Sequence, residues 1–527
     1  MDLRRLLRFR QALLAGACGL AWAGLYGCVV AVISVDPDEP PAPPAASTST
    51  AVPTTPAPAA TDAPAAATTS PPALHPAVTR SLPVNVYFSQ PGDTFFSVSA
   101  RFGGFPLDLS CLDSSPEFCP MSALGEGPEI GFDSNRLIPN GTALLIPAHL
   151  DAHGPALRLI PDSEVVFTAA ASDFDIAGYV DAAGGFLAAH RQYLMINAWN
   201  SAAEVIALVA EENSVNPRLL LALLEYRCGC VLGPAEAPEP FLGADFILRP
   251  DLYGQLIWAV HELSNGYYGW RLGTLTEVTL RDGATVRLNP RLNAGTAALY
   301  RLFAALYDTA GFHQALDPAA GFPAIFADMF GDPWAREIVT IPDGAVQPPL
   351  ALPFETGQIW SYTGGPHAAF ERNGPMAALD FAPASAEPGC QPTPAWVVAA
   401  ADGLVVRSEF GLLIQDLDGD GDENTGWVIM YLHIGADGRV PAGEYLRTGD
   451  RLGQPACEGG RTNGTHLHIA RKLNGEWIPA GTGALPFDLG GWVAADGVEA
   501  YEGTLSRSGV VLIACTCSWR VGWIEND

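Results

Sequence analysis

The sequence predicts a multidomain α+β protein with a mainly helical middle and a β-rich C-terminal part. The chain has 527 residues, and one hydrophobic core seldom extends past about 250–300 residues, so several domains are expected. Residues from about 160 to 345 have the caps and long apolar runs that are typical of helices. From about residue 352, short β-rich runs separated by Gly and Asp turns predict a curled antiparallel sheet.

The first 35 residues predict an export signal or a membrane anchor. Four arginines precede an uncharged apolar run at 12–35, whose 24 residues (35 − 12 + 1) suffice to span a bilayer core of about 30 Å. The basic flank is expected to stay inside and to place the rest of the chain outside. We favour an uncleaved anchor; a signal peptide cleaved near Ala21–Ala23 and a lipid-modified Cys28 are the alternatives.

Residues 36–80 consist mainly of Pro, Ala, Thr and Ser, with hardly an aromatic residue among them. Such a segment cannot bury a core, so we expect an extended, disordered linker. We expect this linker to act as a spacer that holds the folded domains away from a membrane.

The charge of the chain argues against nucleic acid as a partner. The net charge is −29, and Lys472 is the only lysine. Binding to phosphates requires clustered positive charge, which this composition does not supply.

Cysteine usage agrees with export. Beyond the apolar run lie eight cysteines, which mostly fall in local pairs: Cys111, Cys119, Cys228, Cys230, Cys390, Cys457, Cys515 and Cys517. An even number in an oxidising compartment predicts disulfides, although eight cysteines allow 105 connectivities. No CxxC pair exists, which disfavours a zinc finger.

Residues 81–150 predict a small βααβ module, with a strand, a Pro-Gly-Asp turn, an amphipathic helix and a final "LLIP" strand. The pattern resembles a LysM module at eight positions: Gly92, Asp93, Thr94, Ile138, Gly141, Leu144, Ile146 and Pro147. The resemblance implies binding of glycans that contain N-acetylglucosamine. The longer middle with two cysteines departs from the LysM pattern, and a generic α+β linker module is the alternative.

The helical domain at 160–345 contains two clear starts of helices. Ser201 and Glu204 form a capping-box signature before an apolar run. Asn216 and Pro217 form an N-cap and N1 pair for a helix that should end near Gly229. Another helix is expected to start within 288–306.

This region loosely resembles the lysozyme-like fold of lytic transglycosylases. The resemblance implies a general acid at Glu225, at the end of the helix that starts at Pro217. Tyr226 stands where that family usually has Ser. A glutamate near the end of a helix is more often a surface residue, so a structural spacer is the favoured interpretation.

The β-rich C-terminal domain, 350–527, contains four of the ten histidines: His367, His433, His466 and His468. The stretch "THLHIARK" is expected to form a strand, in which successive side chains point to opposite faces. Its two imidazoles, at His466 and His468, therefore point the same way.

The segments "YTGGPHAAFERNGPMAALDFAP", "MYLHI" and "GTHLHIA" together resemble the lysostaphin-like zinc endopeptidases, in particular the β-lytic branch. Most of that family has a compact H-x-x-x-D pair, and Met376 stands at that histidine position here. The β-lytic branch has its histidine further upstream in a "GG-x-H" setting, which "GGPH" and a spacing of 380 − 367 = 13 fit. The resemblance implies His367, Asp380 and His468 as metal ligands, with His433 and His466 as catalytic histidines.

The residue types support these roles. A hydrolytic zinc site uses three N or O protein ligands and one open position for water. Zinc can lower the pKa of a bound water to near 7. Attack on a peptide then requires a donor for the oxyanion and a proton for the leaving amine, which two further histidines can supply.

The segment "DLDGDGDENTG" matches the first half of a calcium loop at Asp416, Asp418 and Asp420. Trp427 stands where a calcium loop has its twelfth-position Glu. An acidic, solvated hairpin turn is therefore slightly favoured over a calcium site.

The sequence therefore predicts an exported cell-wall hydrolase: a zinc endopeptidase that cuts peptidoglycan peptides and is held on glycan by a LysM-like module. Tethering a binder to the enzyme would raise the local concentration of substrate. The alternatives are a non-catalytic peptidoglycan-binding or regulatory envelope protein, and cleavage of the glycan strand through Glu225.

Overall fold

The computed structural model describes residues 83–112, 119, 132–151, 153, 156–194, 198–234, 239–370, 373–384, 388–515 and 522–527. All of them belong to the compact unit Thr79–Asp527. The predicted anchor at 1–35 and linker at 36–80 lie outside the described residues. No helix in the described ranges combines the length and the apolarity needed to cross a membrane.

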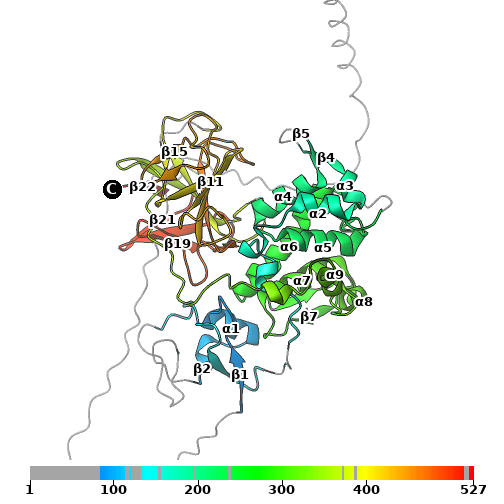
Figure 1. The fold of residues 1–527 in the computed structure, drawn as a ribbon. Helices are drawn as coiled ribbons and strands as arrows, with labels where there is room; N and C mark the ends of the chain where they lie inside the picture. The colour runs from blue at the N-terminus through cyan, green and yellow to red at the C-terminus, as the bar shows by residue number, and fades with distance from the viewer. Residues whose placement is uncertain are drawn as a thin grey trace, which may run out of the picture. The chain divides into compact units, whose positions relative to one another are not determined.

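The first module is a three-stranded antiparallel sheet with one helix (Figure 1). Its elements are β1 (Val84–Phe88), α1 (Phe95–Phe102), the 3-10 turn η1 (Pro106–Asp108), β2 (Ser110–Cys111) and β3 (Ala143–Pro147). The outer elements of the expected βααβ order are present, and β3 lies between β1 and β2. Where a second helix was expected, the described residues form the 3-10 turn and the short strand β2 instead, with 120–131 lying outside them.

The "GDT" turn of this module holds it together. The buried carboxylate of Asp93 accepts hydrogen bonds from the Tyr87 hydroxyl at 2.6 Å and from the Gln90 N–H at 2.8 Å, and it pairs with Arg101. Thr94 caps α1 through a capping box with Ser97. These motif residues thus have a structural use in the turn, because they satisfy buried polar groups.

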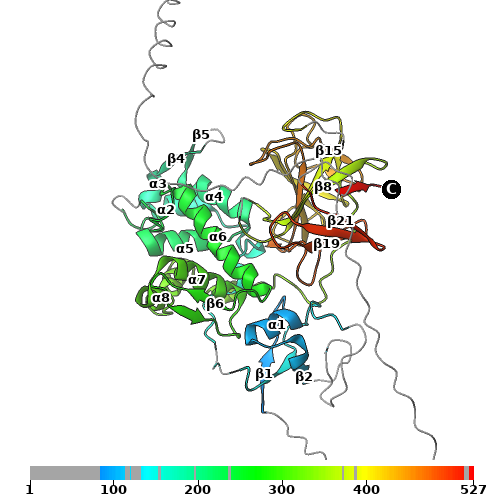
Figure 2. The ribbon, with the colours of Figure 1, turned by 180° about the vertical axis from the view of Figure 1, so that it is seen from behind.

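The second region is mainly helical, as predicted. Its elements are η2 (Asp162–Glu164), η3 (Ala169–Ala171), α2 (Ile176–Ala183), α3 (Phe186–Ala189), β4 (Arg191–Leu194), β5 (Ala198–Ser201), α4 (Ala202–Asn213), α5 (Pro217–Cys228), α6 (Leu252–Arg271), β6 (Glu277–Thr279), β7 (Thr285–Arg287), α7 (Ala294–Leu306), α8 (Thr309–Ala315), α9 (Phe322–Phe330) and η4 (Pro333–Arg336). Figure 2 shows the long helix α6 running across its neighbours, and it packs against α4 and α7.

The predicted caps of the helical region are confirmed. Ser201 and Glu204 form the capping box of α4. Asn216 caps α5, Pro217 is its first residue, and Gly229 ends it in the left-handed conformation. These signals depend on neighbouring residues only, which is why the sequence alone could give them.

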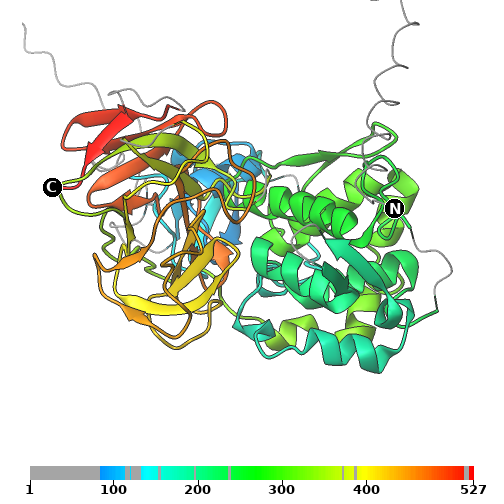
Figure 3. The same cartoon turned by 90° about the horizontal axis from the view of Figure 1, so that it is seen from above.

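The C-terminal region consists of antiparallel strands, seen from above in Figure 3 in yellow to red. They are β8 (Ile359–His367), β9 (Ala378–Pro383), β10 (Val397–Val398), β11 (Gly403–Glu409), β12 (Leu412–Asp416), β13 (Trp427–Leu432), β14 (Tyr445–Leu446), β15 (Arg451–Gly453), β16 (Leu467–Leu473), β17 (Glu476–Trp477), β18 (Asp488–Leu489), β19 (Trp492–Asp496), β20 (Gly503–Arg507), β21 (Val510–Ile513) and β22 (Trp523–Glu525). The largest sheet has the order β14-β11-β12-β13-β16-β9-β8-β22, with β17 paired to β16. A second sheet has the order β18-β19-β20-β21.

The large sheet is buried on both faces. On β16, Leu467 and Ile469 pack into a core shared with the second sheet. Ala470 faces the other way and belongs to the same core cluster as the helices, as does Met430 on β13. Because side chains alternate along a strand, His468 lies on the face that packs against the helical region.

A buried polar cluster joins the regions. Arg271, at the end of α6, pairs with Glu476 on β17 at 3.1 Å and with Asp162 at 3.0 Å. The Tyr267 hydroxyl donates to Glu476 at 2.8 Å, and Arg271 also donates to the Pro91 carbonyl in the first module. Each buried charge thus has an opposite charge, as buried charges require.

The structure forms three disulfides among the described cysteines: Cys111–Cys119, Cys228–Cys230 and Cys390–Cys457. The prediction of disulfides is therefore confirmed.

Candidate metal centre

Neighbouring strands of the large sheet bring the three predicted metal ligands together. His367 is the last residue of β8, Asp380 lies in β9 and His468 lies in β16. These strands are adjacent, and His468 is paired directly with Asp380 in the register. Bulges in β8 before His367 shift its register against β9. The sheet ladder therefore fixes where these side chains meet.

The three ligand atoms converge closely. His367 Nε2 lies 2.9 Å from His468 Nδ1, and both nitrogens lie 3.2 Å from Asp380 Oδ1. All three residues are buried, with exposed fractions of 2% for His367, 7% for Asp380 and 6% for His468. Together they form a group of the kind that can hold a metal ion.

The glycines of "GGPH" allow this convergence. Gly364 pairs with Asp380, and a Cβ at Gly364 would lie 2.6 Å from the carboxylate oxygen Oδ2. A Cβ at Gly365 would lie 2.2 Å from the carbonyl oxygen of Glu502. Only glycine lets the carboxylate and the neighbouring loop approach β8 this closely.

The outer nitrogens of the two ligand histidines are held by backbone carbonyls. His367 Nδ1 lies 2.8 Å from the Gly365 carbonyl, and His468 Nε2 lies 2.9 Å from the Ala369 carbonyl. In a neutral imidazole, the nitrogen that donates to a carbonyl carries the proton, so the inner nitrogen presents its lone pair to the centre. Such bonds orient metal-binding imidazoles and fix their tautomers.

The arrangement fits zinc. Bonds of about 2.0–2.1 Å in tetrahedral geometry place neighbouring ligand atoms about 3.3 Å apart, close to the separations observed here. Among the described residues, none donates a hydrogen bond to the buried Asp380 Oδ1. A buried carboxylate oxygen without a donor is costly unless a cation neutralises it. Two imidazoles, one carboxylate and no thiolate favour a catalytic zinc site.

The electrostatics follow from burial and mutual attraction. Burial, the largest single cause, raises the pKa of Asp380, but the charge of His367 and the interactions with His468 and His466 together hold that pKa well below its usual range. Burial, the largest single cause, lowers the pKa of His367, but the charge of Asp380, the contact with its carboxylate and the Gly365 carbonyl together raise that pKa above its ordinary value. Burial also lowers the pKa of His468, and the interaction of this imidazole with the Asp380 carboxylate opposes the lowering without reversing it. Asp380 is therefore an anion in the folded protein, as a ligand must be.

The two remaining histidines lie beside this centre. His433 follows the last residue of β13, and His466 precedes the first residue of β16. Their ring centroids are 4.6 Å apart. His466 Nε2 lies 3.7 Å from Asp380 Oδ1, whereas His433 is not part of the metal-binding group.

Each of these histidines is oriented by a carbonyl. His433 Nδ1 donates to the Glu458 carbonyl at 2.7 Å, and His466 Nδ1 lies 2.9 Å from the Gly464 carbonyl. Burial, followed by the charges of His466 and His468, lowers the pKa of His433 to about 3. His433 is therefore neutral at neutral pH, with its lone pair on Nε2.

All five residues line one cavity of about 1640 Å³. Its opposite wall comes from the helical region, including Tyr193, Leu208, Glu212, Tyr253, Trp258 and His261. The cavity is larger than typical small-molecule sites of about 300–1,000 Å³.

Two features of the cavity had no motif to predict them. The exposed ring of Tyr501 stacks on His367, with centroids 4.1 Å apart and planes 21° from parallel. The helical wall was likewise not predicted. A signal for it exists in the apolar run "WVIMYL" of β13, because a strand apolar at every position must be covered on both faces.

The other predicted site residues lie elsewhere. Glu225 is half-buried, and its Oε2 accepts hydrogen bonds from the N–H groups of Val231 and Leu232 at 3.0 and 2.9 Å. It does not belong to the described wall of the cavity. A catalytic role for Glu225 remains a prediction.

Asp416, Asp418 and Asp420 gather in the loop between β12 and β13, with ligand oxygens close enough for one cation. Asp416 is buried and accepts hydrogen bonds from the N–H groups of Asp418 and Gly421. The predicted calcium site remains a prediction.

Comparison with known proteins connects this chain to one protease. Residues 158–343 match the family "LasA, N-terminal domain". Protease LasA of Pseudomonas aeruginosa strain PAO1 is 26% identical over 295 residues, which cover 50% of this chain and 64% of LasA. Protease LasA of strain UCBPP-PA14 matches equally. The chain thus spans less than two thirds of the length of these relatives.

Solved structures that match include the M23 metalloprotease pseudoalterin from the deep sea, at 23% identity and a TM-score of 0.27, covering 32% of this chain and 96% of that one. The antimicrobial peptidase lysostaphin from Staphylococcus simulans matches at 16% identity and a TM-score of 0.18, covering 34% of this chain and 81% of that one. The resemblance to the lysostaphin-like zinc metallopeptidases that the histidine motifs indicated is confirmed, and Protease LasA is a relative of this chain.

Proposed function

We propose that this chain is a zinc-dependent endopeptidase that cleaves peptide bonds in the stems or cross-bridges of peptidoglycan. The observation that carries the proposal is the convergence of His367, Asp380 and His468 beside two further histidines in one cavity. The similarity to Protease LasA supports a peptidase over the alternative of a non-catalytic envelope protein.

In this proposal His367 Nε2, Asp380 Oδ1 and His468 Nδ1 hold the zinc. When bound, zinc supplies a Lewis acid that polarises a peptide carbonyl and acidifies a water. The carbonyls of Gly365 and Ala369 keep the two imidazoles in the required tautomers. Burial of the group excludes bulk water and strengthens the attraction of Asp380 for the cation.

In this proposal, His433 and His466 transfer protons during hydrolysis. With Nδ1 bonded to a carbonyl, each presents Nε2 as the atom that can accept or return a proton. Hydrolysis requires one proton to leave the attacking water and one to reach the leaving amine. A protonated imidazole can also donate to the oxyanion that develops on the peptide carbonyl.

The LysM-like module would hold the enzyme on its substrate. Its resemblance to LysM modules supports binding of glycans that contain N-acetylglucosamine, and the N-terminal run supports export with retention at a membrane. Binding the glycan would raise the concentration of peptide stems near the cavity.

The test is digestion of purified peptidoglycan by the full chain with zinc, followed by mass spectrometry of the released fragments. The proposal predicts new amine termini, which mark peptide cleavage. Anhydro-sugar ends would instead indicate cleavage of the glycan strand and would favour a catalytic role for Glu225.

The matched variants are His468→Ala and His313→Ala. His468 is a proposed ligand, whereas His313 lies exposed on α8, far along the chain from the site. Release of fragments is expected to stop in the first variant and to continue in the second. Undiminished release by His468→Ala would remove the zinc mechanism.

A further inference from the structure

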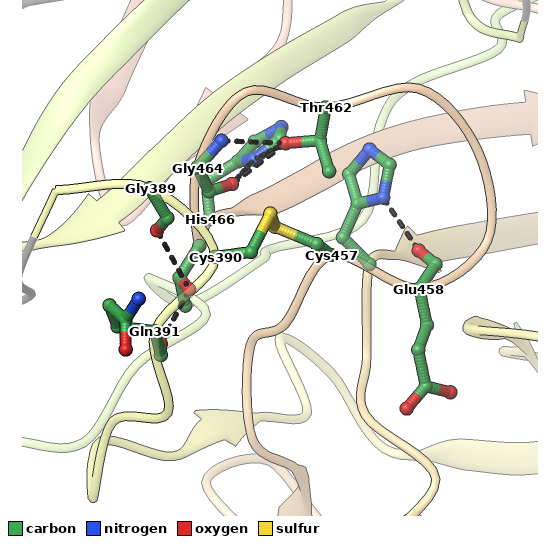
Figure 4. Close-up of a disulfide and its surroundings, with 10 residues drawn as sticks. Gly389, Cys390, Gln391, Cys457, Glu458, Thr462, Gly464 and His466 are labelled. Atoms are coloured by element: carbon green, nitrogen blue, oxygen red, sulfur yellow. Dashed lines mark hydrogen bonds between the residues drawn. A yellow bond between two sulfur atoms is a disulfide. The ribbon is translucent and has the colours of Figure 1, made fainter. Parts of the chain in front are cut away.

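One disulfide lies near His466, one of the two proposed catalytic histidines (Figure 4). It joins Cys390, in the loop after β9, to Cys457, in the loop between β15 and β16. The two cysteines are 67 residues apart in sequence, and their Cα atoms lie 5.7 Å apart. Neither cysteine lies in a named strand, although isolated bridges at Pro455 and Ala456 precede Cys457, so the cross-link adds a constraint between the two loops.

The neighbours of Cys390 hold the residue before His466. The Gly389 carbonyl accepts a hydrogen bond from the Thr465 N–H at 3.1 Å. The Gln391 carbonyl accepts one from the Thr465 hydroxyl at 2.6 Å. Thr465 is buried, so these bonds are shielded from water. The backbone that enters His466 is thus fixed from the Cys390 side.

The neighbours of Cys457 hold His433 itself. The Ala456 N–H donates to the His433 carbonyl at 2.7 Å, and the Glu458 carbonyl accepts from His433 Nδ1 at 2.7 Å. Ala456 also forms an antiparallel bridge with His466. His433 has a φ of 65°, a left-handed conformation that a non-glycine residue keeps only when its surroundings enforce it.

We propose that the Cys390–Cys457 disulfide is a positioning element that sets the orientation of His433 and His466 relative to the metal centre. The inference rests on the proposed function, because it assigns these two histidines a part in hydrolysis. The disulfide contacts no reacting atom and acts only through its neighbours. The metal ligands do not depend on it, because they lie on paired strands.

The first experiment compares the full-length double variant Cys390→Ser/Cys457→Ser with the wild type on a soluble cross-bridge peptide. Misplacement of a catalytic group by about 1 Å can reduce a rate about 100-fold, so kcat is expected to fall by about that factor. KM and zinc content are expected to stay within about twofold, because the cavity wall and the metal ligands are retained.

The matched control is Cys111→Ser/Cys119→Ser, which removes a disulfide from the first module. It is expected to leave kcat, KM and zinc content unchanged. A purely structural role of Cys390–Cys457 would lower the melting temperature and leave kcat of the folded, zinc-loaded enzyme at the wild-type value. That result would overturn the inference.

A variant that keeps the disulfide tests one contact alone. Thr465→Val removes the hydroxyl that donates to the Gln391 carbonyl and preserves the shape of the side chain. Its kcat is expected to fall by less than in the double variant, again with zinc retained. A wild-type kcat in Thr465→Val would exclude this contact as the route from Cys390 to His466.

A measurement without turnover separates the inference from the proposed function. In the zinc-loaded double variant, the imidazole NMR signals of His433 and His466 should shift or broaden, while those of His367 and His468 stay in place. Unchanged signals from all four would overturn the inference even if the wild type proved inactive. A zinc-loaded wild type that cleaves no peptide would contradict the proposed function instead.

Discussion

The proposed metal ligands and the proposed catalytic histidines are neighbours in space but are held in different ways. His367, Asp380 and His468 lie within paired strands: Asp380 and His468 have ladder partners on both sides, and His367 is paired with Ala378 on one side. His433 and His466 each lie one residue outside a strand. Loops, carbonyl contacts and a disulfide hold them there.

This difference suggests a division of labour within one site. A metal ion needs ligand atoms fixed to within a few tenths of an ångström, which a sheet provides. Groups that transfer protons must meet a substrate, and loops at the mouth of a cavity can present them. Changes in the strands should therefore affect metal binding, and changes in the loops should affect turnover.

The largest effect is expected from Asp380→Asn. The amide removes the negative charge that attracts both ligand histidines and the cation. Zinc content should fall to a small fraction of the wild-type value, and the release of peptide should fall by at least about 10³-fold. Metal analysis and the release assay check this, with His313→Ala as the control. A fully zinc-loaded Asp380→Asn enzyme would contradict the proposed role of Asp380, and thus of the strand residues, in binding the metal.

A smaller effect on turnover, with no loss of metal, is expected from His433→Ala. This residue holds no ligand atom of the metal group, so one zinc per chain should remain. Loss of a group that transfers protons should lower kcat by about 10²–10⁴-fold. Steady-state kinetics and metal analysis on the same sample check both parts. Loss of zinc in this variant would contradict the proposal that strand residues bind the metal and that loop residues act in turnover.

The stability of the metal-free protein should depend on pH through His433. Its pKa is lowered to about 3 in the folded state, against about 6.5 in the unfolded chain. Between these values the unfolded state binds the proton, so stability is full above pH 6.5 and is lost as the pH falls towards 3. The free energy of unfolding, measured with denaturant at pH 7 and pH 5, should fall less in His433→Gln than in the wild type. Equal losses would contradict this assignment.

The smallest effect is expected in the loop between β12 and β13, which contains Asp416, Asp418 and Asp420. Burial and the neighbouring Asp416 raise the pKa of Asp418 to about 6. The folded state therefore binds the proton more tightly, and stability declines as the pH rises from about 4 through 6. Asp418→Asn should raise the melting temperature slightly at pH 7 without calcium. Calcium should raise it in the wild type only, and no response in the wild type would dismiss the calcium site.

Much of the local structure could be predicted from the sequence. The caps of α4 and α5 depend on side chains within three residues of the helix starts, so Ser201 and Asn216 were sufficient signals. The five proposed site residues were named from their resemblance to the motifs of one family, and all five line one cavity. Their convergence, however, depends on the pairing of strands that are far apart in sequence.

Other parts of the site lacked a local signal. Tyr501 reaches His367 from a loop more than 130 residues away along the chain, and no pattern marks it. The apolar run of β13 indicates that both faces of this strand are covered, but it does not indicate which helices form the wall of the cavity. The pairing of Cys390 with Cys457 was one of many connectivities that the sequence left open, and no local pattern indicates the contacts of their flanking residues with Thr465 and His433.

The most direct test of the central claim is anomalous diffraction at the zinc edge from crystals of the zinc-loaded full chain. The account predicts one peak within bonding distance of His367 Nε2, Asp380 Oδ1 and His468 Nδ1, with His433 and His466 outside that distance. No peak at this place, or a peak coordinated by other side chains, would contradict it.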